Sequence, residues 1–310
     1  MLHNFAEVLM RAGKNGPVQV VVAVAQDEEA LRAVKAAHDA GLADATLVGD
    51  ATLIKPMLAR VGLAPDTKIV HEPEVVQAAV RAASIVKEMP TGILMKGLIN
   101  SSEFLRAVLH PECGLRTGRL LCHLAAFEVP GDEKLVFHTD GGMNIAPTLL
   151  EKKDILVSAL LALEALGIKL PKVAILTANE VVNPKMPATV DALALVEMNR
   201  QGVFGPALLE GPISMDVALS REAAEHKGIK SEISGQVDLF VVPSIEAGNL
   251  LGKALIYCAK AKSAGVILGA THPVVMVSRA DSADAKLNSI ALACCIASGQ
   301  GAKCFNPKTE

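Results

Sequence analysis

The sequence predicts an α/β fold of two domains, each with a mostly parallel β-sheet between two layers of helices. Three observations lead to this prediction. Short runs rich in β-branched residues alternate with longer helical patterns, those runs are apolar at nearly every position, and the 310 residues exceed the usual size of one domain. Strands that are apolar throughout are buried on both faces, so helices must cover both sides of each sheet.

The expected strands are short apolar runs, and the expected helices repeat apolar residues every three or four positions. Glycine follows two of these helices directly, at Gly41 and Gly167, as is common at helix ends. The expected strands are Val18 to Val24, Gly92 to Met95, Leu135 to His138, Val173 to Leu176, Leu239 to Val242, Val266 to Leu268 and Val274 to Val277. The expected helices are Glu28 to Ala40, Glu74 to Lys87, Ile155 to Leu166, Thr189 to Arg200, Asp216 to Lys227 and Lys286 to Ala297.

Charged residues and glycine concentrate between Glu128 and Asn144, which indicates a boundary between domains. The last long helix, from Lys286, is expected to cross back and pack on the first domain. The first domain would then comprise residues 1–134 and 286–310, and the second residues 135–285. Two closely apposed domains leave a cleft between them, and this interdomain cleft is the expected place of the active site.

Composition argues against several classes of function. With 30 basic and 33 acidic residues, the net charge of −3 gives no field that would attract nucleic acid or an anionic membrane. Aromatic residues make up 3% of the chain, so the stacking surfaces of single-strand binders are missing. No apolar run approaches the ~20 residues that cross a bilayer. The first residues do not resemble a signal peptide, and we expect a cytoplasmic protein with reduced thiols.

Several common sites are also disfavoured. The six cysteines lack metal-ligand spacing, and we expect neither a metal nor a permanently bound cofactor. Neither a GxGxxG motif after the first strand, nor GxxxxGK[ST], nor GxSxG occurs, which disfavours a Rossmann dinucleotide site, a P-loop and a hydrolase elbow. His123 and His138 lie in or beside apolar runs and are expected to be hydrogen-bonded core histidines. Cys294 and Cys295 fall within a helical pattern, as small buried residues do.

The polar turn after the run Val274 to Val277 is the most informative segment. It begins with Ser278 and Arg279 and leads into a helix. Backbone N–H groups and the dipole at a helix start attract phosphate, and an arginine adds charge-assisted hydrogen bonds. In open α/β sheets, ligands lie beyond the carboxyl ends of the strands, which is where these two residues would be. An ordinary capping serine and a surface arginine would give the same pattern.

Other strands also end in polar segments, and several such ends are a stronger signal than one. Each has an ordinary structural alternative: a satisfied turn, a helix cap or a solvated helix face. Glu180 in particular could be an acid, an orienting group or a loop carboxylate. The candidate binding residues at these ends are Lys96, Asn100, Ser101 and Arg106, then Asp140 and Asn144, then Glu180, then Asn249 and Lys253, and finally Asp281.

Six segments carry a family resemblance: Leu94-Met95-Lys96-Gly97, Leu115-Arg116-Thr117-Gly118-Arg119-Leu120-Leu121-Cys122-His123, Thr139-Asp140-Gly141-Gly142-Met143-Asn144, Gly211-Pro212-Ile213-Ser214-Met215-Asp216, Ile245-Glu246-Ala247-Gly248-Asn249 and Val277-Ser278-Arg279-Ala280-Asp281-Ser282. On these segments the chain resembles the phosphate acetyl/butyryltransferase family over nearly its whole length. The first two segments are more similar to the butyryl branch, in which a serine commonly occupies the position of Cys122.

The resemblance implies a two-domain fold like that of isopropylmalate dehydrogenases, and a homodimer or larger homo-oligomer. It also implies transfer of a short acyl group, butyryl or similar, between coenzyme A and inorganic phosphate, with acyl-CoA and phosphate as the partners and coenzyme A as a substrate. In such enzymes the thiol attacks the acyl-phosphate carbonyl directly, without an acyl-enzyme, so the protein supplies positioning and electrostatics. Ser278 and Arg279 would hold the phosphate and neutralise charge on the leaving group or oxyanion, with Arg106 and Lys96 as further cations across the cleft. Ser278, Arg279 and Arg106 are thus the expected catalytic residues.

One position departs from the acetyl-transferring relatives, which carry an aspartate seven residues after the serine as the proposed base; this chain has Ala285 there. Asp281 or Asp284 could replace that base, or the thiol could lose its proton to water or phosphate, so the base is unassigned. Three other functions stay open: a phosphate acetyltransferase with acetyl-CoA as its main substrate, an NAD-dependent hydroxyacid oxidative decarboxylase, and a regulatory acyl-CoA sensor without catalysis.

Overall fold

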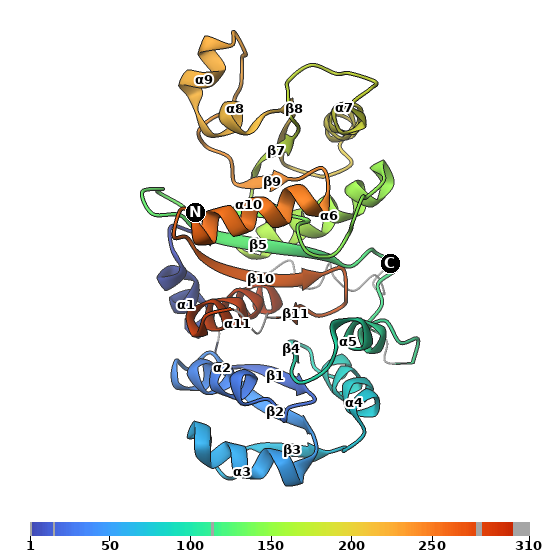
Figure 1. Ribbon diagram of the computed structural model, residues 1–310, viewed down its shortest axis with the longest axis vertical. Helices are drawn as coiled ribbons and strands as arrows, with labels where there is room; N and C mark the ends of the chain where they lie inside the picture. The colour runs from blue at the N-terminus through green and yellow to red at the C-terminus, as the bar shows by residue number, and fades with distance from the viewer. Residues whose placement is uncertain (1, 15, 113–114, 277–280, 300–310) are drawn as a thin grey trace. The chain divides into compact units, whose positions relative to one another are not determined.

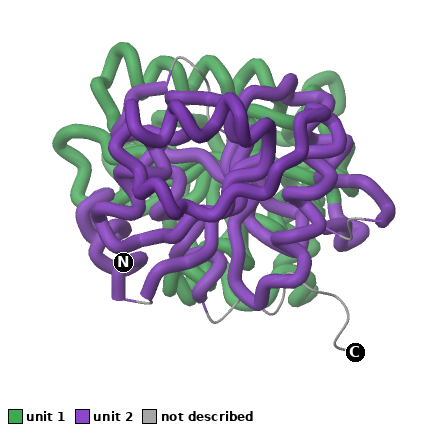
Figure 2. Tube along the Cα trace, turned by 90° about the horizontal axis from the view of Figure 1, so that it is seen from below, with its two compact units in different colours: residues 1, 120–262 green, residues 2–119, 263–310 purple. Residues whose placement is uncertain are grey.

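The computed structural model describes residues 2–14, 16–112, 115–276 and 281–299. The chain forms two compact units (Figure 2). We call residues 120–262 the central unit, and residues 2–119 with 263–310 the terminal unit. Both units combine helices with mostly parallel strands, which confirms the predicted α/β class. Within the described ranges, every helix is too short or too polar to span a lipid bilayer.

The terminal unit is built from segments at both ends of the sequence (Figure 1). Its elements are α1 (Phe5–Lys14), β1 (Val18–Ala23), α2 (Glu28–Asp39), β2 (Ala43–Gly49), α3 (Ala51–Val61), β3 (Lys68–His71), α4 (Val75–Lys87), β4 (Gly92–Lys96), α5 (Ser101–Val108), β10 (Lys262–Leu268), β11 (Val274–Val275) and α11 (Ala283–Ser298). The strands lie in the order β3-β2-β1-β4-β11-β10. Neighbouring strands are parallel, except that β10 and β11 pair antiparallel.

Helices cover both faces of this sheet. α1, α2 and α11 pack together, α4 packs with α5, and α4 and α11 both contact β1 and β4. A strand that two separate groups of helices contact is covered on both sides. This explains why β1 and β4 are apolar at almost every position and almost entirely buried.

The strands of the central unit lie in the order β5-β6-β9-β7-β8. Its elements are β5 (Cys122–Glu128), β6 (Val136–Thr139), α6 (Leu149–Ala165), β7 (Lys172–Leu176), α7 (Pro187–Arg200), β8 (Leu208–Ile213), α8 (Met215–Leu219), α9 (Arg221–His226), β9 (Leu239–Val241) and α10 (Ile245–Tyr257). β5 and β6 pair antiparallel, and the other neighbours are parallel. A buried core that includes Phe127, Val217 and Phe240 joins the sheet to α8, α9 and α10, while α6 and α7 pack on β5, β6 and β8.

The two units change over after Arg119 and after Lys262, whereas the sequence placed the boundaries after residues 134 and 285. The glycine-rich segment that suggested the first boundary is a hairpin turn. β5 and β6 pair across it, with Ala125 opposite His138, and this pairing keeps both strands in one unit. The second change-over comes earlier than expected because β11 pairs with β4 of the terminal unit.

Two elements differ from their predicted form. The expected helix from Asp216 to Lys227 is two short helices, because Ser220 is extended and its hydroxyl accepts the backbone N–H of Ala223 at 3.1 Å, which caps α9. The strand expected at Val274 is antiparallel to its predecessor. Only residues 269–273 join β10 to β11, and a parallel connection needs about a dozen residues or more.

Candidate active site

The carboxyl end of β4 lies against the carboxyl end of β1 through a glycine. A Cβ atom at Gly97 would lie 2.3 Å from the carbonyl oxygen of Val24, so only glycine fits here. Gly97 and Leu98 also donate their backbone N–H groups to the end of β1, at 2.9 and 2.8 Å. This close approach fixes Lys96 at the edge of the sheet, where its ammonium group donates to the carbonyl oxygen of Gly97 at 3.3 Å.

Helix α5 follows this glycine and carries three of the predicted binding residues. Asn100 is its N-cap residue, but its side chain forms no capping hydrogen bond; Nδ2 donates instead to Oε2 of Glu103 at 3.3 Å. Ser101 is exposed at the start of the helix, and Arg106 is exposed in its last turn. The hydroxyl of Ser101 and the positive end of the helix together suit an anion, and Arg106 adds a cation to the last turn of the same helix.

The helix predicted after the polar turn is present as α11. It begins at Ala283, three residues before the predicted start at Lys286. The hydroxyl of Ser282 caps it by accepting the backbone N–H of Ala285 at 3.1 Å. The sequence therefore located this helix start to within one turn.

The predicted phosphate-binding pair, Ser278 and Arg279, lies outside the described residues, and its role stays a prediction. Two carboxylates could replace the base that is missing at Ala285. Asp284 is exposed in the first turn of α11, and Asp281 lies directly before the N-cap residue.

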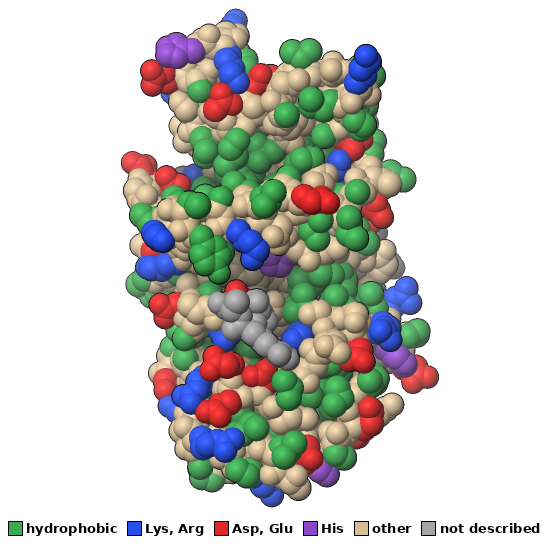
Figure 3. Space-filling view, in the orientation of Figure 1, with side chains coloured by type: hydrophobic (Ala, Val, Ile, Leu, Met, Phe, Trp, Pro, Cys, Tyr) green, Lys and Arg blue, Asp and Glu red, His purple; other side chains and the backbone are tan. Residues whose placement is uncertain are grey.

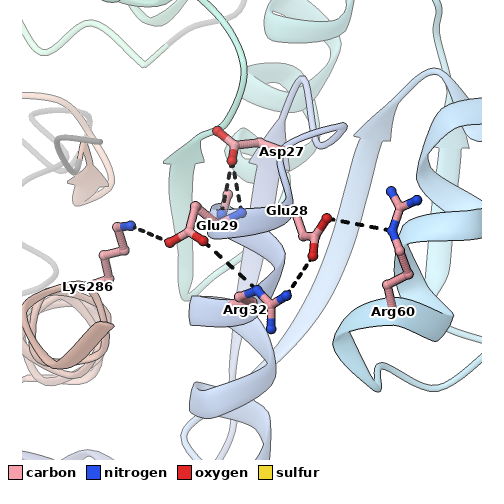
Figure 4. Close-up of polar contacts among 7 residues, drawn as sticks. Asp27, Glu28, Glu29, Arg32, Arg60 and Lys286 are labelled. Atoms are coloured by element: carbon pink, nitrogen blue, oxygen red, sulfur yellow. Dashed lines mark hydrogen bonds and ion pairs between the residues drawn. The ribbon is translucent and has the colours of Figure 1, made fainter. Parts of the chain in front are cut away.

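An ion pair between a buried lysine and an exposed glutamate, which the sequence did not predict, holds the start of α11 against α2 (Figure 4). The side chain of Lys286 is 4% exposed, and its ammonium lies 3.0 Å from Oε2 of Glu29. The hydrogen bond from Lys286 lowers the pKa of the Glu29 carboxyl. Arg32 lies 3.9 Å from Glu29 and 2.6 Å from Glu28, and Arg60 lies 3.6 Å from Glu28. The helix that follows the predicted phosphate-binding turn is thus tied to α2 and, through it, to α3.

In the central unit, Asp140 organises the turn that follows β6. Its side chain is buried, and its carboxylate accepts the backbone N–H groups of Gly142 and Met143, both at 2.9 Å, and of Asn144 at 3.3 Å. Nδ2 of Asn144 donates to the same carboxylate at 2.6 Å and to the carbonyl oxygen of Leu121 at 2.9 Å. Both predicted binding residues are therefore engaged by the turn itself.

Helix α10 rests on this turn through contact between two glycines. A Cβ atom at Gly248 would lie 2.5 Å from Cα of Gly141, so a side chain there would push the helix away. Nδ2 of Asn249 lies 3.5 Å from the carbonyl oxygen of Gly141. Lys253, one turn further along, is exposed. The structure thus brings the predicted residues of the turn and of α10 to one edge of the central unit.

Glu180 belongs to a polar cluster at the ends of β7 and β8. The hydroxyl of Ser214 hydrogen-bonds to Glu180 and lies 2.5 Å from Oδ1 of Asp216. The ammonium of Lys227 lies 3.0 Å from Glu180 and 2.9 Å from Asp216. Ser214 foremost, and then Lys227, lower the pKa of both carboxyls, to about 2 for Asp216, and the two carboxylates raise the pKa of Lys227. Glu180 is the one member of this charged, internally paired cluster that the sequence predicted as a binding residue.

The buried histidine and cysteines are suited to packing rather than to catalysis. Burial, and secondly the charge of His123, lower the pKa of His138 to about 3, so its ring is neutral. Nδ1 of His138 has no hydrogen-bond partner among the residues described, and the ring packs edge-on against Phe127; that these core histidines are hydrogen-bonded stays a prediction. Burial raises the pKa of Cys294 to about 12 and that of Cys295 to about 11, as expected for core thiols. No cluster of three or more potential metal-ligating side chains occurs in the described ranges.

Cationic, hydroxyl and amide groups thus gather at strand ends in each unit, and comparison with known proteins identifies the family. Residues 65–294 match the family model for phosphate acetyl/butaryl transferase. The chain belongs to this family. The predicted resemblance is therefore confirmed.

Relatives within the family span nearly the full chain. The phosphate butyryltransferase of Clostridium acetobutylicum is 44% identical over 298 residues, which cover 96% of this chain and 99% of the relative. The phosphate acetyltransferase of Thermotoga maritima is 36% identical over 293 residues, which cover 93% and 98%. The crystal structure of a branched-chain phosphotransacylase from Enterococcus faecalis matches with a TM-score of 0.81 and 32% identity, covering 91% of this chain and all of that one.

Proposed function

We propose that this family member is a phosphate acyltransferase that moves a short acyl group, preferentially butyryl, between coenzyme A and inorganic phosphate. In one direction the sulfur of coenzyme A bonds to the carbonyl carbon of the acyl phosphate, the bond from that carbon to the phosphate oxygen breaks, and phosphate leaves. The observation that carries the proposal is the 44% identity to a phosphate butyryltransferase over 96% of the chain.

The residues divide into those that contact substrate and those that position others. Ser278 and Arg279 bind the phosphate and stabilise the oxyanion of the tetrahedral state, aided by the cations Lys96 and Arg106. The uncapped start of α5, with Asn100 and Ser101, supports a second contact for an anion in the same unit. Among the groups of the central unit, Asn249 and Lys253 are the substrate contacts.

Asp140, Asn144 and Glu180 act in this proposal as positioning residues. Each of their polar side chains already takes part in the hydrogen bonds of its own turn or cluster. Breaking a charge-assisted hydrogen bond costs free energy, so a substrate gains little by displacing these partners. Their contribution is to hold the turn under α10 and the ends of β7 and β8 in one conformation.

The thiol can be activated without a dedicated base in the place of Ala285. A free thiol with a pKa near ~8.5 is already a few per cent thiolate at neutral pH, and a cationic site stabilises that form. Asp281 and Asp284 are the carboxylates that could accept the proton. Coenzyme A enters the proposed reaction as a substrate. The proposal includes no metal and no permanently bound cofactor. We also propose a cytoplasmic homo-oligomer, as the family resemblance implies.

The experiment is an acyl-CoA panel. Acetyl-, propionyl-, butyryl- and isobutyryl-CoA are each incubated with phosphate, and both free thiol and acyl phosphate are measured. We expect equal amounts of the two products and the highest kcat/KM with butyryl- or isobutyryl-CoA. One methylene contributes only ~1–3 kcal/mol to discrimination between substrates in a pocket, so acyl-CoAs of neighbouring chain length will also be turned over. A maximum with acetyl-CoA would favour the second candidate, a phosphate acetyltransferase, which the 36% identical relative supports.

The Arg279→Ala variant tests the phosphate site in the same assay. Removing one donor to a developing oxyanion typically costs ~100- to 1000-fold in kcat, and we expect a loss of that size. Arg200→Ala is the matched control, because Arg200 is exposed at the end of α7 and pairs with Glu197. Near-normal activity of Arg279→Ala would refute its role. Tight binding of coenzyme A without any product from any acyl-CoA would show a sensor instead of an enzyme.

A further inference from the structure

One face of α10 combines apolar, aromatic and cationic side chains and is exposed. Leu250, Lys253, Ala254 and Tyr257 are three, four and seven residues apart, so they lie on one side of the helix. Leu250 is 69% exposed and Tyr257 is 63% exposed. We call these four residues the α10 face. Figure 3, in the orientation of Figure 1, shows hydrophobic and basic side chains together over this helix.

The opposite side of α10 is fixed in the core, which holds the α10 face outward. Gly248 and Gly252 are buried, and Leu251, Leu255 and Ile256 pack on the core cluster of the central unit. An ideal Cβ atom at Gly252 would lie 3.4 Å from the ring of His138. The helix therefore cannot turn to bury Leu250 and Tyr257 without losing these contacts. Large exposed apolar side chains gathered on a rigid element often mark a binding surface.

We propose that the α10 face binds the adenosine end of coenzyme A. The inference rests on the proposed function and adds a subsite to it. Tyr257 is the single tyrosine of a chain without tryptophan, so it is a rare aromatic surface on which an adenine ring can stack. Leu250 and Ala254 extend the apolar area beside it.

The charges on this side of the helix set the direction in which the ligand lies. The ammonium of Lys253 forms no hydrogen bond or ion pair within the described part of the chain, so it is available to a phosphate group. Glu246 lies in the first turn, where a carboxylate would repel phosphates, whereas at the other end the ammonium of Lys260 donates to the carbonyl oxygen of Tyr257 at 2.9 Å. The anionic end of the ligand therefore belongs at the Lys253–Tyr257 end, away from Glu246.

The helix is long enough to hold the ligand in this orientation. Asn249 and Tyr257 are eight residues apart, which is about 12 Å along a helix. A ligand with its adenine on Tyr257 and its phosphates at Lys253 directs its pantetheine arm towards Asn249. Asn249 contacts the Gly141 carbonyl of the turn that Asp140 organises. The thioester end then reaches the edge of the central unit where the predicted binding residues gather.

The test compares substrates with and without the adenosine end. Butyryl-CoA carries it, and butyryl-pantetheine has the same thioester but lacks adenosine and all phosphates. For Tyr257→Ala and Lys253→Ala we expect the KM for butyryl-CoA to rise about tenfold, since base stacking and phosphate contacts are each worth about that factor. The kcat and the KM for phosphate should change by less than about twofold. With butyryl-pantetheine, both variants should match the wild type.

Two further variants separate the proposed contact from general damage. Tyr257→Phe keeps the aromatic ring and should behave as wild type. Lys169→Ala removes an exposed lysine of the central unit that lies in the α6–β7 loop, and it should leave every constant unchanged. A tenfold loss that persists with butyryl-pantetheine would overturn the proposal, because the α10 face would then act on the thioester end or on the fold.

The outcome also distinguishes this inference from the proposed function. An active wild type whose KM for butyryl-CoA is unaffected by both alanine variants refutes the subsite alone. A wild type that is inactive with every acyl-CoA refutes the proposed function. In that case, calorimetric titration with adenosine 3′,5′-bisphosphate decides: weaker binding to Tyr257→Ala than to Tyr257→Phe supports the subsite, and equal binding refutes it.

Discussion

The carboxylate of Asp140 is the acceptor around which the turn after β6 is built. It receives three backbone N–H groups and the side-chain amide of Asn144, and it is 3% exposed. Hydrogen bonds to a buried charged group contribute more to the free energy of unfolding than hydrogen bonds between neutral groups. Loss of the carboxylate would also leave several donors without a partner. The residue therefore governs the conformation of the turn on which α10 rests.

Replacing Asp140 tests this role. We expect Asp140→Ala to lower the free energy of unfolding by about 2–4 kcal/mol and to raise the KM for acyl-CoA, because α10 loses its support. Urea denaturation and steady-state kinetics measure the two effects. Asp132→Ala, in the exposed β5–β6 turn, is the control and should stay within about 0.5 kcal/mol of wild type. A variant at Asp140 with normal stability but no activity would instead indicate direct contact with substrate.

At the scale of an element, the seating of α10 depends on Gly248. An alanine at Gly248 would bring its Cβ atom to 2.5 Å from the backbone of Gly141, whereas at Gly252 the nearest atoms are 3.4 Å away. We expect Gly248→Ala to destabilise the protein by about 1–3 kcal/mol through this overlap and to raise the KM for acyl-CoA. Gly252→Ala should change the free energy of unfolding little. The added methyl group makes only ordinary contacts at 3.4 Å, and the gain in helix propensity of about 1 kcal/mol offsets any small strain.

The comparison of Gly248→Ala and Gly252→Ala by thermal unfolding checks the packing argument within a single helix. Similar losses in both variants would contradict the packing argument, because helix propensity alone would make both substitutions stabilising and only Gly248 touches the backbone of Gly141. A large loss confined to Gly252→Ala would mean that the His138 ring beneath it, rather than the turn, sets the position of α10.

The elements that the sequence predicted and those it did not differ in how local their signals are. β1 and α2 have continuous apolar patterns, and the sequence located both. β8 contains Gly211-Pro212 and α3 contains Pro56, residues that indicate turns when neighbours in space are unknown. The pairing of β8 with β7 keeps that segment extended despite the glycine and proline. Tertiary contacts override local preference at these places.

The candidate site shows the same limit. Strand ends and turn residues are visible in the sequence, and Lys96, Asp140 and Asn249 all lie at strand ends or helix starts as expected. The partners of such residues come from distant segments. Lys227 meets Glu180 and Lys286 meets Glu29 only because the chain folds back, and nothing in their neighbouring sequence indicates these pairs. The role of Glu180 as an internally bonded group could not be predicted for this reason, whereas the partners of the Asp140 carboxylate lie only two to four residues along the chain.

At the scale of the molecule, the described residues whose pKa values are shifted most towards acid sensitivity lie in the central unit. His138 has a pKa of about 3 because of burial, far below the value of about 6.5 that an unfolded chain gives. Hydrogen bonds from Ser214 and Lys227 also lower the pKa values of Glu180 and Asp216. In the terminal unit, burial lowers the pKa of His272, but its bond to the Met89 carbonyl opposes that shift, and Glu29 is an exposed group.

These shifts predict which unit loses stability first in acid. Below pH ~6.5 the unfolded chain binds a proton at His138 that the folded chain does not, so stability falls by up to ~1.4 kcal/mol per pH unit as the pH drops towards 3. Below about pH 4.5, Glu180 and Asp216 act in the same direction, because their folded pKa values lie below the unfolded ones. We therefore expect amides of the central unit to lose protection before those of the terminal unit. Hydrogen exchange measured by mass spectrometry at pH 7 and pH 4.5 checks this order.

The His138→Gln variant assigns the effect to the imidazole. Glutamine does not titrate, so between pH 6.5 and 4.5 its free energy of unfolding should fall less steeply than that of the wild type. His226→Gln, on the exposed end of α9, is the matched control and should keep the wild-type slope. If His138→Gln also keeps that slope, a different group carries the acid sensitivity. If the terminal unit opens first in the wild type, the uneven distribution of shifted groups does not decide where acid unfolding begins.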